Sequence, residues 1–296
     1  MSNSFYSLNL PSLKTITIPN NISNIGYGAL SGCSGLTSIV IPFGITSLIK
    51  SLRNNSGFKN IVLPETITSI EMYEFSECRD LTFIAIPEGV TSIGDYAFYG
   101  CHSLTSIIIP DSVTTIGKQA FYQCYNLKSV TLSNNITNIG EQAFTSCANL
   151  ISIDILNDTT QINTNAITET PSLKAFIDPS EIKDIGQNAF IGCNNLTSVI
   201  IPNNIKFIGN GAFSGDYFLI SVTIPDSVTR INPYAFSDCY SVLEYHLLPT
   251  TPPTLVDKNA FDGITSGTKI YVPAASLEAY KTATNWSTYA NYMEGE

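Results

Sequence analysis

The stretch IPEGVTSIGDYAFYGCHSLTSIIIP, residues 86–110, decides the fold because its pattern returns along nearly the whole chain. A proline or its substitute recurs at steps of 22 to 24 residues. Self-similarity at such a period is typical of solenoids. We predict a repeat array over residues 1–273 and a cap over residues 274–296. About eleven repeats begin near Pro19, Pro42, Pro64, Pro87, Pro110, Ser133, Leu156, Pro179, Pro202, Pro225 and Pro249.

Each repeat has one apolar side. Alternation in LTSIIIP predicts a short strand with Leu104, Ile107 and Ile109 facing inward. Proline ends this strand because it has no N–H for a ladder. The segment VTSIG predicts a second extended piece that stops at Gly94, which we expect to supply an unusual backbone angle. Stacking buries the apolar side against neighbouring repeats, so the predicted fold is a solenoid of short parallel strands with irregular turns and little helix.

The repeated pattern Lxx[IV]x[IL]PxxVxxIGxxAFxxC resembles the BspA-type leucine-rich repeat family of bacterial and protozoan surface proteins. The segment KIYVPAASLEAYKTATNWSTYANYM, residues 269–293, resembles the closing segment of bacterial members. The resemblance implies a right-handed leucine-rich repeat coil with a C-terminal helical cap. It also implies a place at the cell surface or outside the cell, and binding to host matrix proteins or other cells.

The amino-acid composition narrows the classes of partner that the chain is expected to bind. The formal net charge is −10, with 14 Lys+Arg against 24 Asp+Glu. The negative electrostatic field of such a chain disfavours binding to nucleic acid and to anionic membranes. No run of about 18 apolar residues occurs, so we expect no membrane insertion. The first residues, MSNSFYSLNL, lack the pattern of a signal peptide. The surface location therefore rests on the resemblance alone.

The cysteines share one column of the repeat, 14 residues after the proline position. Seven is an odd number, so at least one thiol is unpaired, and no paired-cysteine metal spacing occurs. Free buried cysteine packs as a small hydrophobe. We expect a structural ladder rather than a redox or metal site, formed by Cys33, Cys78, Cys101, Cys124, Cys147, Cys193 and Cys239.

No catalytic constellation is recognisable. The two histidines, His102 and His246, are more than six repeats apart. A Cys101/His102 nucleophile pair would need an exposed thiol, whereas the cysteine column indicates burial. Neither a phosphate-binding glycine loop nor a His-Glu metal motif is present. We therefore expect a protein that is not an enzyme and that needs no cofactor.

Two surfaces are candidates for binding a protein partner. Tyrosine combines large contact area with a polar handle, which binding surfaces use. The first candidate is therefore the non-strand side, with Tyr73, Tyr96, Tyr99, Tyr122 and Tyr125, although these rings could merely cover the turns. The alternative is the short, polar strand face, which we expect to be concave, with Thr105, Ser106, Lys128 and Ser129.

Three further features depart from the consensus. The third repeat carries an acidic run from Glu65 to Asp80, including Glu74, which we read as a solvated stripe in preference to a cation site. The second and seventh repeats depart from the consensus. A bend in the array, an interruption for binding, or simple drift of the repeat sequence would each explain this. Trp286, the only tryptophan, is expected to cover the last repeat as part of the cap.

The sequence thus predicts a non-catalytic binding or adhesion module. The alternatives are a structural spacer or scaffold that presents other domains, and an intracellular scaffold. The ligand is not identified by any motif in the chain.

Overall fold

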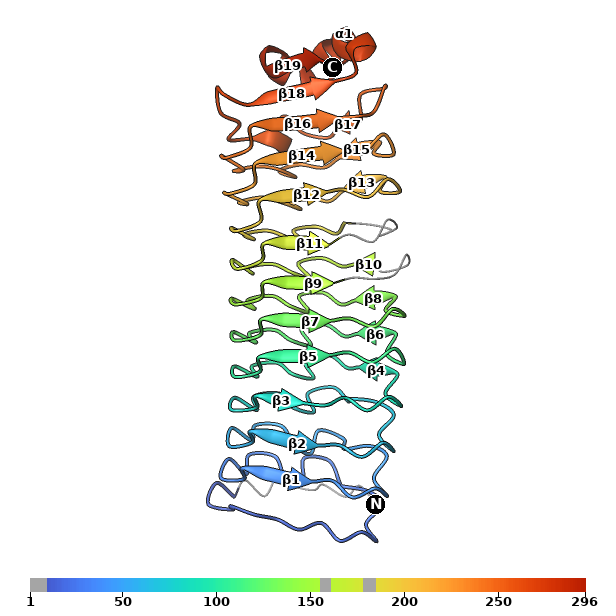
Figure 1. Ribbon diagram of the computed structural model, residues 1–296, viewed down its shortest axis with the longest axis vertical. Coiled ribbons are helices and arrows are strands. Elements are labelled where there is room, and N and C mark those ends of the chain that lie inside the picture. The colour runs from blue at the N-terminus through green and yellow to red at the C-terminus, as the bar shows by residue number, and fades with distance from the viewer. Residues whose placement is uncertain (1–9, 155–160, 178–184) are drawn as a thin grey trace. The chain divides into compact units, whose positions relative to one another are not determined.

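The computed structural model describes residues 10–154, 161–177 and 185–296 (Figure 1). These residues divide into two compact units, Met1–Leu150 and Ile151–Glu296. Each unit is a β-solenoid of parallel turns, as the repeat predicts. The repeat starts expected at Leu156 and Pro179 lie outside the described residues.

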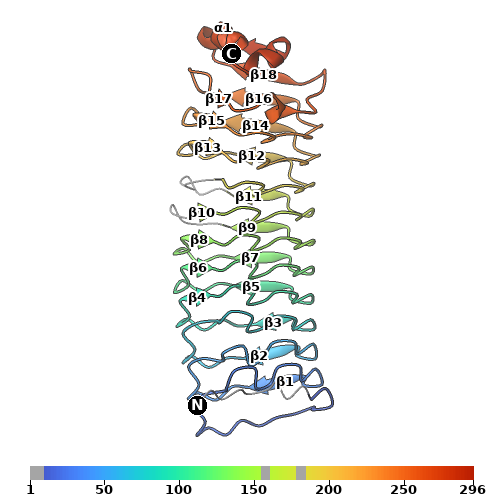
Figure 2. The ribbon, with the colours of Figure 1, turned by 180° about the vertical axis from the view of Figure 1, so that it is seen from behind.

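In unit 1, a strand lies just before the repeat starts at Pro42, Pro64, Pro87, Pro110 and Ser133, and a second strand follows the starts at Pro87, Pro110 and Ser133 (Figure 2). Strands of consecutive repeats pair in parallel: β1 with β2, β2 with β3, β5 with β7, and β4 with β6 and β6 with β8. The first row holds β1 (Ser38–Val40), β2 (Asn60–Val62), β3 (Phe83–Ile84), β5 (Ser106–Ile108) and β7 (Ser129–Thr131). The second row holds β4 (Ser92–Ile93), β6 (Thr115–Ile116) and β8 (Asn138–Ile139).

Unit 2 continues the same plan and ends in the cap. Its first row contains β9 (Ser152–Asp154), β11 (Ala175–Ile177), β12 (Ser198–Ile200), β14 (Ser221–Ile224), β16 (Glu244–Leu247) and β18 (Lys269–Val272). Its second row contains β10 (Gln161–Ile162), β13 (Phe207–Ile208), β15 (Arg230–Ile231) and β17 (Thr254–Leu255). A 3₁₀ turn, Lys258–Phe261, follows β17.

The cap comprises a 3₁₀ turn (Ala274–Ser276), α1 (Leu277–Thr282), a second 3₁₀ segment (Trp286–Tyr292) and β19 (Met293–Gly295). The 3₁₀ turn and α1 together provide the C-terminal helical cap that the resemblance implies. β19 was not predicted. It pairs in parallel with β18 and closes the last sheet.

The core of each unit is a set of stacked columns. The expected inward residues Leu104, Ile107 and Ile109 are all buried. Phenylalanines one repeat apart lie face to face, with ring centroids about one strand spacing apart. The ring pairs are Phe75–Phe98, Phe98–Phe121 and Phe121–Phe144 in unit 1, and Phe190–Phe213, Phe213–Phe236 and Phe236–Phe261 in unit 2, at 5.1–5.4 Å.

Glycine recurs at the repeat position of Gly94 and Gly117 for a different reason from the one expected. Gly94 and Gly117 do not have positive φ. A Cβ on Gly117 would instead lie 2.5 Å from the backbone nitrogen of Asp95, so close approach between repeats demands glycine. Positive φ falls at other positions of the repeat, on glycines such as Gly28 (64°) and also on residues with side chains, among them Tyr96 (58°) and Gln119 (52°). Their N–H groups donate to carbonyls of the next repeat.

Candidate functional site

The predicted polar patch lies on the first strand row of unit 1. Ser106 begins β5 and Ser129 begins β7, and the two residues are paired in register. Thr105 and Lys128 precede these strands. All but Ser106, which is half-buried, are exposed. The four residues therefore share one accessible surface, which we call the strand face.

The strand face also carries an apolar row that sequence reasoning missed. Val40, Val62 and Ile108 are 70%, 64% and 65% exposed, although each belongs to a hydrophobic run. Each sits between two inward-facing residues, so strand alternation turns its side chain outward. Val40 and Val62 are paired in register, and Ala85 holds the same repeat position, exposed, between Val62 and Ile108. We call Val40, Val62, Ala85 and Ile108 the apolar row.

Charges of opposite sign border this row along the chain. Lys59 and Lys128 lie three residues before the row positions of their repeats, and both are exposed. Glu65, Glu88 and Asp111 lie three residues after it, and they are exposed too. Acidic side chains therefore border the apolar row on one side, whereas on the other side Lys59 is the one basic residue at this position within the repeats of the row and Lys128 lies one repeat beyond it. A partner with one apolar edge and charges on both sides would match it.

The tyrosines lie over the turns in two stacks. Tyr73 and Tyr96 stack with ring centroids 4.6 Å apart, and Tyr99 and Tyr122 stack at 5.4 Å. Tyr125 packs at 4.8 Å against the ring of His102. Of the five tyrosines, only Tyr125 is exposed, and the others are half-buried. The stacking partners cover ring faces that a ligand would otherwise use.

The acidic run of the third repeat is not a solvated stripe as a whole. Glu74 is 1% exposed, and burial raises the pKa of its carboxyl to about 7. The carboxylate accepts hydrogen bonds from the backbone N–H groups of Lys50 and Leu52. Glu77 forms an ion pair of 2.8 Å with Arg79. Among the described residues, no group of three potential ligands could hold a metal ion.

The carboxylate of Glu74 completes the backbone hydrogen bonding of the irregular second repeat. In regular repeats, alternate backbone N–H groups donate to carbonyls of the next repeat, as Gly28 does to Ile49 and Leu30 to Ser51. The second repeat is one residue short, and Lys50 and Leu52 donate to Glu74 instead. A side-chain carboxylate thereby replaces two peptide carbonyls.

The cysteine column is a ladder of buried thiols. All seven are buried and free. The thiol of Cys101 donates to the carbonyl of Phe75 at 3.1 Å, and Cys124 donates to Phe98 at 3.3 Å. Asn55, in the same column, donates to Leu30. A small hydrogen-bond donor therefore suits the position, and burial raises the pKa of the Cys78 thiol to about 12, which disfavours the reactive thiolate there.

Asp216 occupies this column where cysteine is the rule. It is fully buried, and burial raises the pKa of its carboxyl well above the usual range. Sequence reasoning did not detect it, although the missing cysteine between Cys193 and Cys239 was a usable signal.

Trp286 is buried in the cap. Its Nε1 donates to the carbonyl of Pro253 at 2.7 Å, and its ring contacts Tyr280 and Phe261 at centroid distances of 5.3 and 5.6 Å. The side chain therefore joins the cap to the last turns of unit 2.

The two histidines lie in different units. His102 packs on Tyr125 in unit 1, whereas His246 lies between the carboxylates of Glu244 and Glu296 in unit 2. Within the described ranges, no helix has the length and apolarity needed to cross a bilayer.

Comparisons with known proteins agree on the repeat. The sequence profile of BspA type leucine rich repeat regions matches residues 1–87, 68–197 and 160–287. No curated protein matches the chain.

Several solved structures are similar. A leucine rich cell surface protein from Faecalibacterium prausnitzii is 28% identical over 90% of this chain and 79% of its own, with a TM-score of 0.51. A leucine rich repeat protein from T. pallidum is 27% identical over 54% of this chain and 77% of its own, with a TM-score of 0.50. The pneumococcal vaccine antigen PcpA shares the fold at 19% identity, covering 89% and 70% of the two chains with a TM-score of 0.52.

Leucine-rich repeat solenoids typically mediate protein interactions or act as scaffolds, and are typically non-catalytic. With the profile covering most of its length, the chain belongs to the BspA-type leucine-rich repeat family.

Proposed function

We propose that the chain is a non-catalytic adhesion module that binds a protein of the host matrix or of another cell through the strand face of unit 1. The observation that carries the proposal is the apolar row. Val40, Val62 and Ile108 are each 64–70% exposed at the same position of their repeats, with Ala85 between Val62 and Ile108. Burying such a row against a partner is favourable at roughly 25 cal/mol per Å² of apolar area.

Rigid presentation supports this choice of face. The row side chains stand on strands whose backbones are paired, for example β1 with β2, and whose alternate residues are packed in the core. Little side-chain entropy is lost when Val or Ile is buried, because β-branched residues are already stiff at χ1. The charged borders add orientation, since they would select a partner with complementary charges.

The tyrosine surface remains the competing site. Its rings are large, but most are half-buried and stacked on one another. A spacer that presents other domains is the competing function, and it requires no binding surface.

The test is binding to single immobilised extracellular-matrix proteins by biolayer interferometry. The triple variant Val40→Thr, Val62→Thr, Ile108→Thr should bind at least ten-fold more weakly than the wild type, roughly the cost of losing one hot spot. Threonine keeps the strand preference, and Thr131 already occupies this position in β7.

Two controls separate the alternatives. Ile200→Thr makes the same change at a 70% exposed strand position of unit 2 and should leave binding unchanged. If Tyr96→Ala, Tyr99→Ala and Tyr122→Ala together abolish binding while the threonine variant binds normally, the tyrosine surface is the site. If the wild type binds no matrix protein or cell surface, the spacer is the better function.

A further inference from the structure

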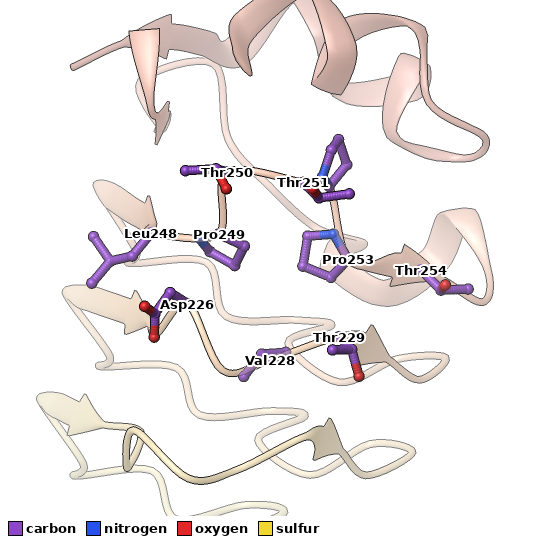
Figure 3. Close-up of a pocket in the computed structure, with 10 residues that line it drawn as sticks. Asp226, Val228, Thr229, Leu248, Pro249, Thr250, Thr251, Pro253 and Thr254 are labelled. Atoms are coloured by element: carbon purple, nitrogen blue, oxygen red, sulfur yellow. The ribbon is translucent and has the colours of Figure 1, made fainter. Parts of the chain in front are cut away.

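A pocket of about 470 Å³ lies in unit 2, between two consecutive connections from the first strand row to the second (Figure 3). Asp226, Val228 and Thr229 form one wall, on the connection between β14 and β15. Residues 248–254 form the other wall. The second connection, residues 248–253, is one residue longer than the first, residues 225–229.

The upper wall is held rigidly. Pro249, Pro252 and Pro253 restrict its backbone. Three side chains of the cap also donate to its carbonyls: Tyr280 to Pro249 at 2.8 Å, Ser276 to Thr250 at 2.6 Å and Trp286 to Pro253 at 2.7 Å. The pocket therefore exists before any ligand arrives, which lowers the entropy cost of binding.

Asp226 is the only charged residue that lines this pocket. At the same repeat position in unit 1, Asp111 accepts a hydrogen bond from the backbone N–H of Asn134 at 3.2 Å. Pro249 follows Asp226 by the same number of residues as Asn134 follows Asp111, and proline has no N–H. In the described part of the chain, Asp226 has no hydrogen bond or ion pair. The neighbouring cation, Arg230, donates to Asn232 instead.

We propose that this pocket binds one basic side chain, arginine or lysine, of a protein partner. The cationic head would pair with Asp226 while its aliphatic stem lies along Leu248 and the proline rings, as long basic side chains do on mixed surfaces. Exposed threonine hydroxyls at Thr250 and Thr251 supply further acceptors. The net charge of −10 favours approach of a basic partner. The site is separate from the strand face of unit 1.

The test uses methyl NMR of the full chain, with Leu, Val and Thr methyl groups labelled. N-acetyl-arginine methylamide should cause saturable shifts at Val228, Leu248 and Thr251. N-acetyl-citrulline methylamide has nearly the same shape without the charge, and should bind at least five-fold more weakly. Asp226→Asn should weaken the arginine probe to the same extent. Asp111→Asn, the matched change in unit 1, should leave its affinity unaltered.

The proposal is overturned if the neutral probe shifts the same methyls equally, or if the arginine probe gives no saturable shift there at 100 mM. Equal affinity for Asp226→Asn and the wild type would also overturn it. The comparison of two probes on the wild-type chain needs no variant, so a folding defect cannot obscure it. The threonine variant of the apolar row should bind the arginine probe normally, which keeps this test independent of the proposed function.

Discussion

Replacing Glu74 by glutamine should remove a pH dependence of stability that the buried carboxyl creates. Burial raises the pKa of Glu74 from 4.5 to about 7 in the folded chain. Below pH 4.5 the group is protonated whether the chain is folded or unfolded. Between pH 4.5 and 7 the unfolded chain releases the proton and the folded chain keeps it. Stability therefore falls as pH rises through this window, and levels off above it.

The size of the effect follows from the two pKa values. A difference of one in pKa corresponds to ~1.4 kcal/mol. Integrated from pH 5 to pH 7.5, the loss is about 2 kcal/mol of unfolding free energy. Glutamine cannot ionise, so the variant should lack this component. Glu74→Ala, although alanine is common at this repeat position, should be destabilising because the N–H groups of Lys50 and Leu52 would lose their acceptor.

The assay is urea unfolding followed by circular dichroism at pH 5.0, 6.0 and 7.5. The quantity to compare is the change in unfolding free energy between pH 5.0 and 7.5. Subtracting the change in Glu74→Gln from that in the wild type leaves the contribution of Glu74, because the contributions of other groups cancel. Glu65→Gln, an exposed change in the same repeat, should follow the wild type. Parallel pH profiles for the wild type and Glu74→Gln would refute the reasoning.

Four further outcomes are expected. A bulky thiol reagent should label almost none of the seven cysteines in native protein and about seven after denaturation, because all are buried; rapid native labelling, or a disulfide found by mass spectrometry, would contradict this. Trp286→Ala should lose roughly 3–5 kcal/mol of unfolding free energy and promote self-association seen in light scattering, and a monomer with unchanged melting would disprove the capping role. Gly117→Ala should destabilise by roughly 1–3 kcal/mol in urea unfolding, because its Cβ would meet backbone at 2.5 Å, whereas Gly267→Ala, with nothing within 4 Å and no positive φ, should cost less; equal losses would contradict the close-approach argument. Asp216→Cys should raise stability at pH 8 by about 1 kcal/mol or more, with a smaller gain at low pH because the folded carboxyl has a raised pKa; a loss of stability would show that the carboxyl is needed.

The repeat could be predicted because each of its columns is set by burial. Phe98 and Ile107 return at a fixed period only if every turn buries them in the same way. The period does not say why glycine recurs, and Gly117 is required by close approach rather than by φ. β19 could not be predicted, since MEG has no strand pattern, and its pairing with β18 alone defines it.

The surface was harder to predict for two physical reasons. In a run of consecutive hydrophobic residues such as IIIP, the sequence does not distinguish the outward-facing residue from the inward-facing ones. The exposed Ile108 therefore resembles a core residue in the sequence. A charged residue is usually solvated, so Glu74 was read as exposed, although it replaces backbone acceptors inside the fold. The five tyrosines do gather over the turns, but their mutual stacking depends on rotamers that a sequence does not encode.

The hydrogen bonds from Lys50 and Leu52 to Glu74 bear on how such an array can change over generations. Most repeats can be copied or lost singly, because each offers its neighbour the same backbone carbonyls. The second repeat has no such freedom, since the groups that complete it belong to a side chain of the third. Recombination that separated the two would leave two amide groups without acceptors. These two repeats therefore form one heritable block, and a designer shortening the array should cut on either side of the pair.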